Sequence, residues 1–479
     1  MKRIFQKFSL LLVLILVLGS LACAKPYDGP VPKSFNQSPL LEEQVEKGSL
    51  PPVEERLPVP EDVYVVEPNE SIGNYGGTLR TTSIRPEGYG DDSVLASFRN
   101  MIKPNPEGNA FIPEVAKKLE TSSDMTTYTM HLRKGMKWSD GHPLTAEDIM
   151  FWYNDILLNK QLTSAVWPEW KANGEVVEVT KLDKYTVQFK YAAPKPFFKN
   201  SMVHSSPGIF TPKHFLKQFH PNYTPKEEIV KEAKSRGYDN WVAYFEDRND
   251  VEFSLPMNKE RPTIAAYVLD EKTSSKRIYK RNPYYWKVDT EGNQLPYLDK
   301  IRTEIVTDTE VVQGMIMSGE IDFAGMQTDI RNYPMYKKYE DQGNYKTILW
   351  KSGMGSDVIY MVNLTHKDKR LRDVFQNVKF RKALSLGINR EEINNSIYFG
   401  RAEPRQYTVL ETSKYFEPEY AKAYTDFKPE KAKELLEDIG LVDRNGDGWR
   451  DYFNGDKFVF TIEYFAVEAP KQPNVELVA

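Results

Sequence analysis

Residues 131–148 constrain the local backbone more than any other segment of this chain, because several residues with strong conformational preferences follow one another closely. Trp138 needs a buried position for its large ring, and the Asp-Gly pair at 140–141 is typical of a tight turn. Thr145, with Asp148 three residues later, predicts a capping box at the start of a helix. The segment therefore predicts a strand, a turn and a helix in succession, and its residues are expected to be structural rather than ligand-binding.

Strand patterns occur on both sides of this segment. A Gly-Gly turn at 75–77 leads into a strand, residues 185–191 alternate with apolar side chains on one face, and residues 300–306 form a less regular strand candidate. Strands and helices are thus mixed along the chain.

Two helices are marked by their ends. Residues 428–441 carry apolar side chains at helical spacing, with Pro429 suited to the first position and Gly440 to the stop. Asn389, followed by Glu392, predicts a capping box on another helix.

Length, charge and cysteine content set outer limits. The chain has 479 residues, which is enough for two or three domains. Lys and Arg number 64 against 68 Asp and Glu, and the resulting net charge of −4 gives no reason to expect nucleic acid or an anionic membrane surface as the main partner. The single cysteine, Cys23, excludes an intrachain disulfide and a cysteine-rich zinc site.

The first residues have the pattern of a bacterial export signal. Basic residues precede an almost wholly apolar stretch at 8–18 that is too short to span a bilayer comfortably. Small residues then lead to Cys23, as in a bacterial lipobox, where the thiol receives a lipid and becomes the new N-terminus. Ser20 stands where a leucine is usual. We therefore expect a signal peptide at 1–22 and lipidation of Cys23, with ordinary cleavage nearby as the alternative.

Residues 23–75 are rich in proline and acidic residues. Such a composition does not bury enough apolar surface to offset the entropy of ordering the chain. The segment is expected to be an extended tether between the anchor and the folded body, part of which packs on the surface through the apolar run at 63–66.

The corner at 131–148 resembles the defining motif of the solute-binding proteins that serve ABC importers of peptides, nickel and oligosaccharides. Further segments look like the same family, in the family's order, at 281–286 with 295–299, at 319–323, and at 361–364 with 378–393. Together the matches span residues 75 to about 465.

The resemblance implies a two-lobed α/β fold of the periplasmic-binding-protein kind. It places the first lobe at 76–95 and 207–350, an inserted subdomain at 96–206 and the second lobe at 352–479. Solute would lie between the lobes, which close around it by a hinge. The closed protein, expected to be a monomer, would deliver its solute to the permease subunits of an ABC importer.

The resemblance also leads us to expect that the second lobe is incomplete. In the family, a strand like 457–464 is followed by a helix, more of the second lobe and a return into the first; here the helix barely begins, at Val475. In peptide-binding members an aspartate that holds the amino terminus of the ligand comes from that further part, so no residue of this chain is assigned the role.

Residues 443–451 resemble the first part of a calcium-binding loop, D-x-[DN]-x-[DN]-G. Side-chain oxygens would come from Asp443, Asn445 and Asp447, a carbonyl from Trp449 and a water-mediated contact from Asp451. Asn454 stands at the twelfth position, where a bidentate Glu is usual. A polar turn is the favoured interpretation and bound calcium the alternative; no other cofactor is expected.

The sequence contains no clear motif for a zinc site or a hydrolase. The histidines show no H-E-x-x-H or zinc-site spacing, and His214 and His220 are expected at polar surface positions. There is no G-x-S-x-G motif, and the abundant carboxylates do not single out a glycosidase pair.

Ligand contacts are nominated from loops expected to reach the cleft. They are Arg85 and Tyr89 after the first strand, Trp167 and Trp170 in a proline-containing loop, and Tyr360 and Asn363 at the entry to the second lobe. For each aromatic residue, the alternative to a ligand contact is a structural position in the core or on the surface. For Asn363, the alternative is a hydrogen bond to the backbone at the end of a strand.

The leading hypothesis is an extracytoplasmic, lipid-anchored protein that captures oligopeptides or related solutes for an ABC importer. An oligosaccharide-binding member of the same family is the first alternative, because Trp and Tyr side chains suit stacking on sugar rings. The alternative from another class is a surface lipoprotein hydrolase, which two close carboxylates with a raised pKa would favour.

Overall fold

The computed structural model describes residues 27, 29–88, 90–96, 100–105, 110–249, 257–464 and 470–479. The chain divides into two units. The first runs to Ile316 and includes Glu320–Gln327, and the second consists of Met317–Gly319 and Thr328–Ala479. Cys23 and the predicted signal peptide lie outside the described residues. Among those residues, no helix has both the length and the apolar character needed to cross a membrane.

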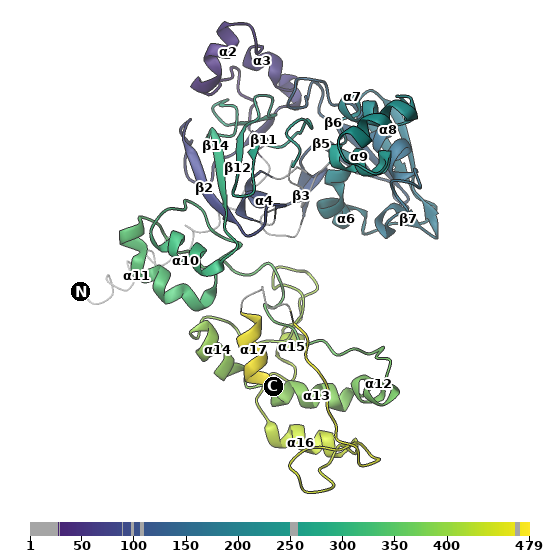
Figure 1. Cartoon of the computed structure of the whole chain (residues 1–479), viewed down its shortest axis with the longest axis vertical. Coiled ribbons are helices and arrows are strands. Elements are labelled where there is room, and N and C mark those ends of the chain that lie inside the picture. The colour runs from purple at the N-terminus through teal and green to yellow at the C-terminus, as the bar shows by residue number, and fades with distance from the viewer. Residues whose placement is uncertain are drawn as a thin grey trace, which may run out of the picture. The chain divides into compact units, whose positions relative to one another are not determined.

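A mixed four-stranded sheet of the first unit has the order β11-β12-β14-β2 (Figure 1). Its strands are β2 (Thr78–Ser83), β11 (Tyr267–Lys272), β12 (Lys276–Arg281) and β14 (Lys300–Ile305). β2 and β14 are parallel, and the other neighbours are antiparallel. The predicted strands after residue 77 and at 300–306 are confirmed. Gly76 and Gly77 have φ values of +119° and +81°, a region that favours glycine, and so form the expected turn.

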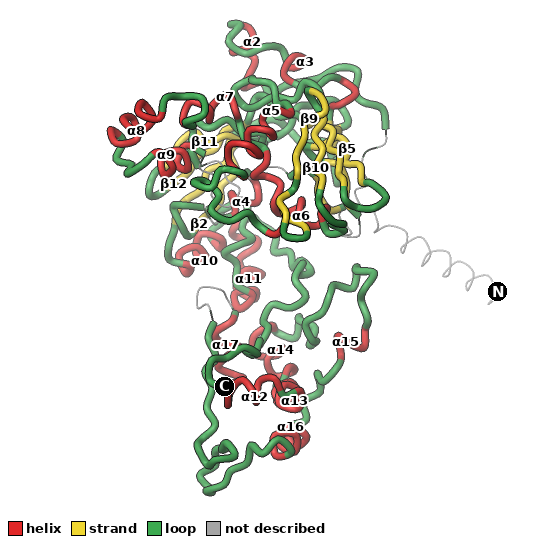
Figure 2. Tube along the Cα trace, turned by 90° about the vertical axis from the view of Figure 1, so that its right-hand side faces the viewer, coloured by secondary structure: helices red, strands yellow, loops and turns green. Residues whose placement is uncertain are grey.

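A second four-stranded sheet of the same unit is antiparallel, with the order β5-β6-β10-β9. Its strands are β5 (Ala116–Thr121), β6 (Thr127–Leu132), β9 (Glu178–Asp183) and β10 (Thr186–Lys190). Figure 2 shows strands β5, β10 and β9 of this sheet beside helix α5 (Ala146–Phe151). Val187 and Phe189 are fully buried, as the alternating pattern of this strand predicted.

The strand–turn–helix corner is confirmed in detail. Trp138 is fully buried, and the turn that follows it contains Gly141 at φ +89°. Thr145 Oγ1 accepts a hydrogen bond from the Glu147 N–H at 3.3 Å, and Asp148 Oδ2 accepts one from the Thr145 N–H at 2.9 Å. The capping box at the start of α5 therefore forms as expected.

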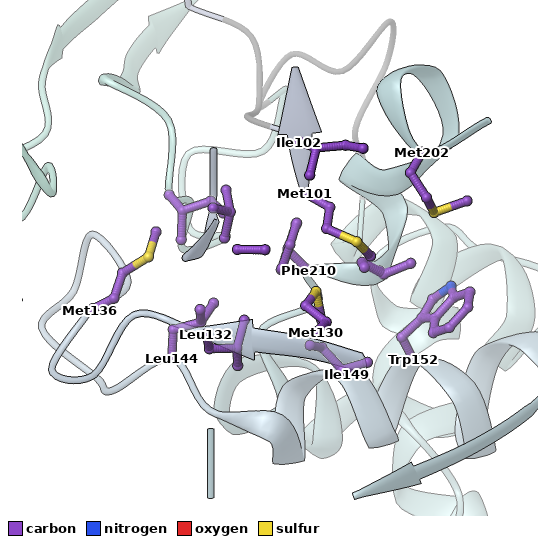
Figure 3. Close-up of a cluster of buried hydrophobic side chains, with 14 of the residues drawn as sticks. Met101, Ile102, Met130, Leu132, Met136, Leu144, Ile149, Trp152, Met202 and Phe210 are labelled. Carbon is purple, nitrogen blue, oxygen red and sulfur yellow. The ribbon is translucent and has the colours of Figure 1, made fainter. Parts of the chain in front are cut away.

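Both sheets of the first unit share one apolar core. Tyr279 and Ile301 of the first sheet and Val187 of the second belong to the same cluster. Figure 3 shows part of it, where Met130 of β6 lies close to Met101 and Phe210. Because one core serves both sheets, the region predicted as an inserted subdomain is packed continuously with the first sheet.

The remaining elements of the first unit surround these sheets. They are α4 (Asp91–Leu95), β3 (Ile102–Pro104), β4 (Phe111–Pro113), η3 (Trp152–Leu157), η4 (Pro168–Trp170), β7 (Lys171–Ala172), β8 (Glu175–Val176), α6 (Phe198–Ser205), η5 (Ser206–Ile209), α7 (Lys213–Leu216), η6 (Lys217–Phe219), α8 (Lys226–Ser235), α9 (Trp241–Arg248), β13 (Lys287–Asp289) and α10 (Thr309–Met317). Phe151 of α5 joins Leu216, Ile229 and Trp241 in an apolar cluster. Helices α7–α9 therefore pack against the region predicted to be inserted (Figure 1).

The N-terminal segment differs from the extended tether expected at 23–75. It contains η1 (Pro39–Leu41), α2 (Glu42–Glu46), α3 (Val53–Arg56), η2 (Pro60–Asp62) and β1 (Tyr64–Val66). β1 pairs in parallel with β13, and Val53, Leu57 and Val65 pack with Val288. The tether prediction is wrong for this stretch, because widely spaced apolar residues find a partner surface formed much later in the chain. The expected packing of the run at 63–66 is confirmed.

The second unit is helical. Its helices are η8 (Ile330–Asn332), α11 (Tyr333–Gly343), α12 (Lys369–Gln376), α13 (Val378–Gly387), α14 (Arg390–Tyr398), α15 (Pro418–Lys422), α16 (Pro429–Glu437) and α17 (Lys471–Val478). α16 confirms the predicted helix, with Pro429 at its first position, although it ends before Gly440. Asn389 caps α14 by accepting the Glu392 N–H at 3.2 Å. The Glu392 carboxylate accepts a bond from the Asn389 side-chain amide (3.0 Å), so only the first half of the predicted box is seen.

Two predictions for the end of the chain are wrong. Residues 457–464 form no strand in the described structure beyond a single bridge between Lys457 and Asp451, because pairing with residues 450–452 does not extend past the hydrogen bond from the Phe458 N–H to the Arg450 carbonyl oxygen. The last helix begins at Lys471 rather than at Val475.

Candidate functional site

The loop after β2 presents Arg85 to solvent. Its backbone is fixed from the protein interior by Arg277, whose Nη1 donates to the carbonyl oxygens of Arg85 (2.8 Å) and Pro86 (2.9 Å). Arg277 Nε also donates to Asp92 Oδ2 at 2.7 Å, and both side chains are fully buried. A buried ion pair thus gives the Arg85 loop a rigid base. Tyr89, nominated from the same loop, lies outside the described residues.

A second buried carboxylate ties this loop to another. Asp91 Oδ1 accepts the N–H groups of Gly325 (2.9 Å) and Met326 (2.7 Å). Burial raises the pKa of Asp91 above its ordinary value, although these hydrogen bonds oppose the shift. Sequence reasoning did not find Asp91, Asp92 or Arg277. The available signals were two adjacent acids after glycine and an arginine at an inward-facing position of a strand.

The two nominated tryptophans lie three residues apart and have opposite environments. Trp170 is buried, with its ring 4.7 Å from that of Trp152 and 6.1 Å from that of Phe189. It therefore belongs to the core. Trp167 is 68% exposed.

The backbone on which Trp167 stands is held in place. Lys195 Nζ donates to the carbonyl oxygens of Pro168 and Lys171, both at 2.7 Å, and Tyr191 Oη donates to that of Glu169 at 2.9 Å. Trp167 is therefore an exposed ring on a fixed loop, which is suited to stacking on a ligand because little ordering is needed on binding.

The residues nominated in the second unit lie in irregular backbone. Asn363 is exposed, and its Oδ1 accepts the N–H of Thr365 at 3.0 Å, so its side chain closes a turn. The backbone hydrogen bond agrees with its alternative role, but no strand ends at this residue in the described structure. Tyr360 is half-buried, and its hydroxyl oxygen has no hydrogen-bond partner in the described part of the chain. Burial raises the pKa of Tyr360 to about 12, which keeps it a neutral hydroxyl.

The segment predicted as a polar turn or calcium loop forms a compact loop. Asp443 accepts the N–H groups of Gly446 and Gly448, and Asp451 accepts that of Arg444 at 2.8 Å. The exposed polar side chains thus behave as turn residues, whereas Asp451 is buried.

The corner carries a cluster that spacing did not reveal. His214 Nε2 lies 2.7 Å from Asp140 Oδ2, His142 Nδ1 lies 3.3 Å from the same oxygen, and the two imidazole rings stack with centroids 4.1 Å apart. Burial would raise the pKa of Asp140, but hydrogen bonds from His214 and His142 outweigh it and lower the pKa. The separation of 2.7 Å is that of a hydrogen bond, which joins α7 to the corner.

His220 was expected at the surface, and this prediction is wrong. The ring is fully buried between Phe151, Trp241 and Phe245. Its Nε2 lies 3.1 Å from the carbonyl oxygen of Asp155, and burial lowers its pKa. The aromatic residues of α9 create this pocket, and they are distant in sequence.

Comparison with known proteins gives consistent matches. The family described as bacterial extracellular solute-binding proteins, family 5 Middle, matches residues 110–479. The periplasmic alpha-galactoside-binding protein of Rhizobium meliloti (strain 1021) is 28% identical over 446 residues, which are 86% of this chain and 60% of that protein.

Two solved structures extend this picture. An oligopeptide-binding protein OppA is 38% identical, with a TM-score of 0.70, over 88% of this chain and 66% of that one. The periplasmic binding protein MelB from Agrobacterium fabrum C58, solved with stachyose, is 25% identical, with a TM-score of 0.62, over 92% of this chain and 69% of that one. These matches confirm the α/β fold and are consistent with the expected two-lobed architecture. The chain spans 60% of the length of the Rhizobium relative.

Proposed function

The chain belongs to the bacterial extracellular solute-binding proteins of family 5, and on that premise we propose that it captures oligopeptides or related solutes outside the cytoplasm and delivers them to the permease subunits of an ABC importer. The observation that carries the proposal is the 38% identity to an oligopeptide-binding protein over 88% of the chain. The hydrolase alternative is set aside, because the named relatives are solute-binding proteins.

Two described side chains have the chemistry that a peptide needs. Arg85 is exposed on a loop anchored by a buried ion pair, and a guanidinium forms strong, directional hydrogen bonds with a peptide carboxylate. Trp167 offers an exposed aromatic surface for apolar side chains. Both are held on ordered backbone, so binding orders few additional groups.

Calorimetric titration with peptides of graded length tests this proposal. We expect saturable binding by the wild-type protein and an affinity about tenfold lower, ~1.4 kcal/mol, for Trp167→Ala. Trp449→Ala removes another exposed indole and serves as the matched control, with affinity unchanged. Absence of binding to peptides of every length would contradict the peptide proposal.

An oligosaccharide is the second candidate, supported by the alpha-galactoside-binding relative and by the stachyose complex. Flat aromatic rings such as that of Trp167 stack on sugar faces, and this contact needs no charged partner. Titration with stachyose separates the two candidates. For a peptide ligand, Arg85→Gln weakens binding about tenfold or more, whereas a neutral sugar should be insensitive to it.

We further propose that the protein is anchored through a lipid on Cys23, which lies outside the described residues. The support is the apolar stretch at 8–18 and the small residues before the only cysteine. Expressed with its own leader in a bacterium, the wild-type protein should enter the detergent phase on phase separation, and Cys23→Ser should stay in the aqueous phase. A wild-type protein that remains aqueous would refute the anchor without bearing on solute binding.

A further inference from the structure

The loop at 443–451 has an arrangement that solute capture does not use. It follows α16, and its ends are held together because the Asp451 N–H donates to the carbonyl oxygen of Val442 at 2.9 Å. Gly448, the sixth residue of the loop, has φ +86°, a conformation that favours glycine. Calcium loops require glycine at this sixth position for their sharp turn.

Most of the loop is satisfied as a polar turn. Asp443 accepts the N–H groups of Gly446 at 2.7 Å and Gly448 at 2.9 Å. Asn445 and Asp447 each accept the N–H of the residue two positions further on, both at 2.9 Å. These contacts alone do not call for a metal.

Asp451 is the residue that a polar turn leaves unexplained. Its side chain is 1% exposed, and its Oδ2 accepts the N–H of Arg444, the second residue of the loop, at 2.8 Å. Because one oxygen is bonded to the loop backbone, the carboxylate is directed into the loop. The other oxygen, Oδ1, is buried and has no hydrogen-bond partner among the described residues. A buried carboxylate oxygen without a partner is strongly unfavourable unless a cation compensates it.

The nearby basic residues do not supply that cation. Arg444 donates to the carbonyl oxygens of Gly440 (2.9 Å) and Tyr452 (3.2 Å), and Arg450 donates to that of Leu441. In the described part of the chain, none of the three loop carboxylates forms an ion pair.

We propose that residues 443–451 form a calcium-binding loop. Its ligands are side-chain oxygens of Asp443, Asn445, Asp447 and Asp451 and the carbonyl oxygen of Trp449. Calcium is favoured because all these ligands are oxygens, and because calcium accepts about six to eight of them in flexible geometry, with water completing the set. Asp451 at the ninth position supplies the closing carboxylate that Asn454 at the twelfth does not. The proposal is independent of solute binding.

Calorimetric titration of the metal-free protein with calcium chloride is the first test. We expect one calcium ion per chain with a Kd of about 10⁻³ M or tighter, in the range of extracellular modules, and at least about tenfold weaker binding for Asp447→Ala. Asp426→Asn, which alters an exposed carboxylate elsewhere in the second unit, is the matched control and should leave the affinity unchanged. No calcium-dependent heat at about 10 mM, or binding unaffected by Asp447→Ala, would overturn the proposal.

Two further variants locate the ion. Terbium bound in the loop should show luminescence sensitised by Trp449, and Trp449→Phe should lose this emission while calcium affinity stays within about twofold, because the carbonyl ligand remains. Asp451→Asn keeps an acceptor for the Arg444 N–H but removes the buried charge. It should weaken calcium binding at least about tenfold and raise the melting temperature of the metal-free protein. A lower melting temperature for metal-free Asp451→Asn, with calcium affinity unchanged, would show a purely structural role and refute the site.

Discussion

Replacing Arg277 with methionine tests how much the buried ion pair contributes beneath the Arg85 loop. The substitution keeps an unbranched side chain of similar reach but removes the guanidinium, leaving Asp92 fully buried. Three hydrogen bonds disappear together, at 2.7 Å to Asp92 and at 2.8 and 2.9 Å to the carbonyl oxygens of Arg85 and Pro86. The variant therefore combines an uncompensated buried charge with two carbonyl groups that have lost a donor.

The size of the effect follows from the burial of both partners. Removing one partner of a buried pair costs about 3–5 kcal/mol, because the remaining charge stays out of water. Replacing both partners by apolar residues costs much less. The wild-type pair is itself incompletely satisfied, since Arg277 Nη2 and Asp92 Oδ1 have no hydrogen-bond partner within the described residues. We therefore expect Arg277→Met to destabilise by about 3–5 kcal/mol, and Asp92→Leu combined with Arg277→Met to recover about half or more of that loss.

Urea unfolding of the wild type, both single variants and the double variant gives the required free energies. Lys280→Met, on an exposed position of the same strand, is the matched control and should change stability by less than about 0.5 kcal/mol. Hydrogen exchange of the backbone at 84–88 should accelerate in Arg277→Met, because its anchor is gone. A loss below about 1 kcal/mol for Arg277→Met would refute the reasoning, and so would a double variant as unstable as the sum of the singles.

Three further substitutions probe other parts of the structure. Thr145→Ala removes the cap of α5 and should lower the free energy of unfolding by about 1 kcal/mol in urea titration. Burial raises the pKa of Asp148 from 3.8 to about 6 in the folded protein. The contribution of Asp148 to stability is therefore fully present below pH 3.8 and is lost as the pH rises through about 6. The stability of the wild type relative to Asp148→Asn should therefore fall by up to about 3 kcal/mol between these pH values, which urea titrations at several pH values would measure. Phe380→Ala should cost about 3–5 kcal/mol in thermal or chemical unfolding, whereas Phe399→Ala at an exposed position should cost little.

Features fixed by neighbouring residues were predictable from sequence. The corner at 131–148 depends on a capping box, a tight turn and one large ring, all within a few residues of each other. The same holds for the first turn of α16 and for the Asn389 cap. In each case the hydrogen-bond donor and acceptor are close in sequence, so a pattern of a few residues specifies the geometry.

The burial of Trp167 and Trp170 could not be predicted from local sequence patterns. Their residue type is the same and they are three positions apart, yet one is 68% exposed and the other 4%. The difference comes from Trp152 and Phe189, which surround Trp170 after the chain has folded back. The buried Asp92–Arg277 pair is subject to the same limit, because its members are 185 residues apart.

The amino-acid composition of the N-terminal segment predicted an extended tether, and this was wrong because composition does not record where the apolar residues stand in the sequence. Few residues there are apolar, but Val53, Leu57 and Val65 are placed so that all three contact one surface that includes Val288. Such a segment needs only this set of contacts and the ladder between β1 and β13 to become ordered. A scarcity of apolar residues therefore predicts disorder only when no complementary surface exists elsewhere in the chain.

Residues 457–464 show a different limit, because their sequence pattern predicts burial but not the formation of a strand. Phe458 and Phe460 pack in the apolar cluster of Phe375 and Phe380, so the alternating pattern is used for burial. A strand also requires a neighbour that pairs its backbone N–H and C=O groups along its length. In the described structure this pairing is limited to the bridge between Lys457 and Asp451 and the hydrogen bond from the Phe458 N–H to the Arg450 carbonyl oxygen. Alternation thus predicts which side chains are buried, whereas strand formation depends on a second segment that the local pattern does not encode.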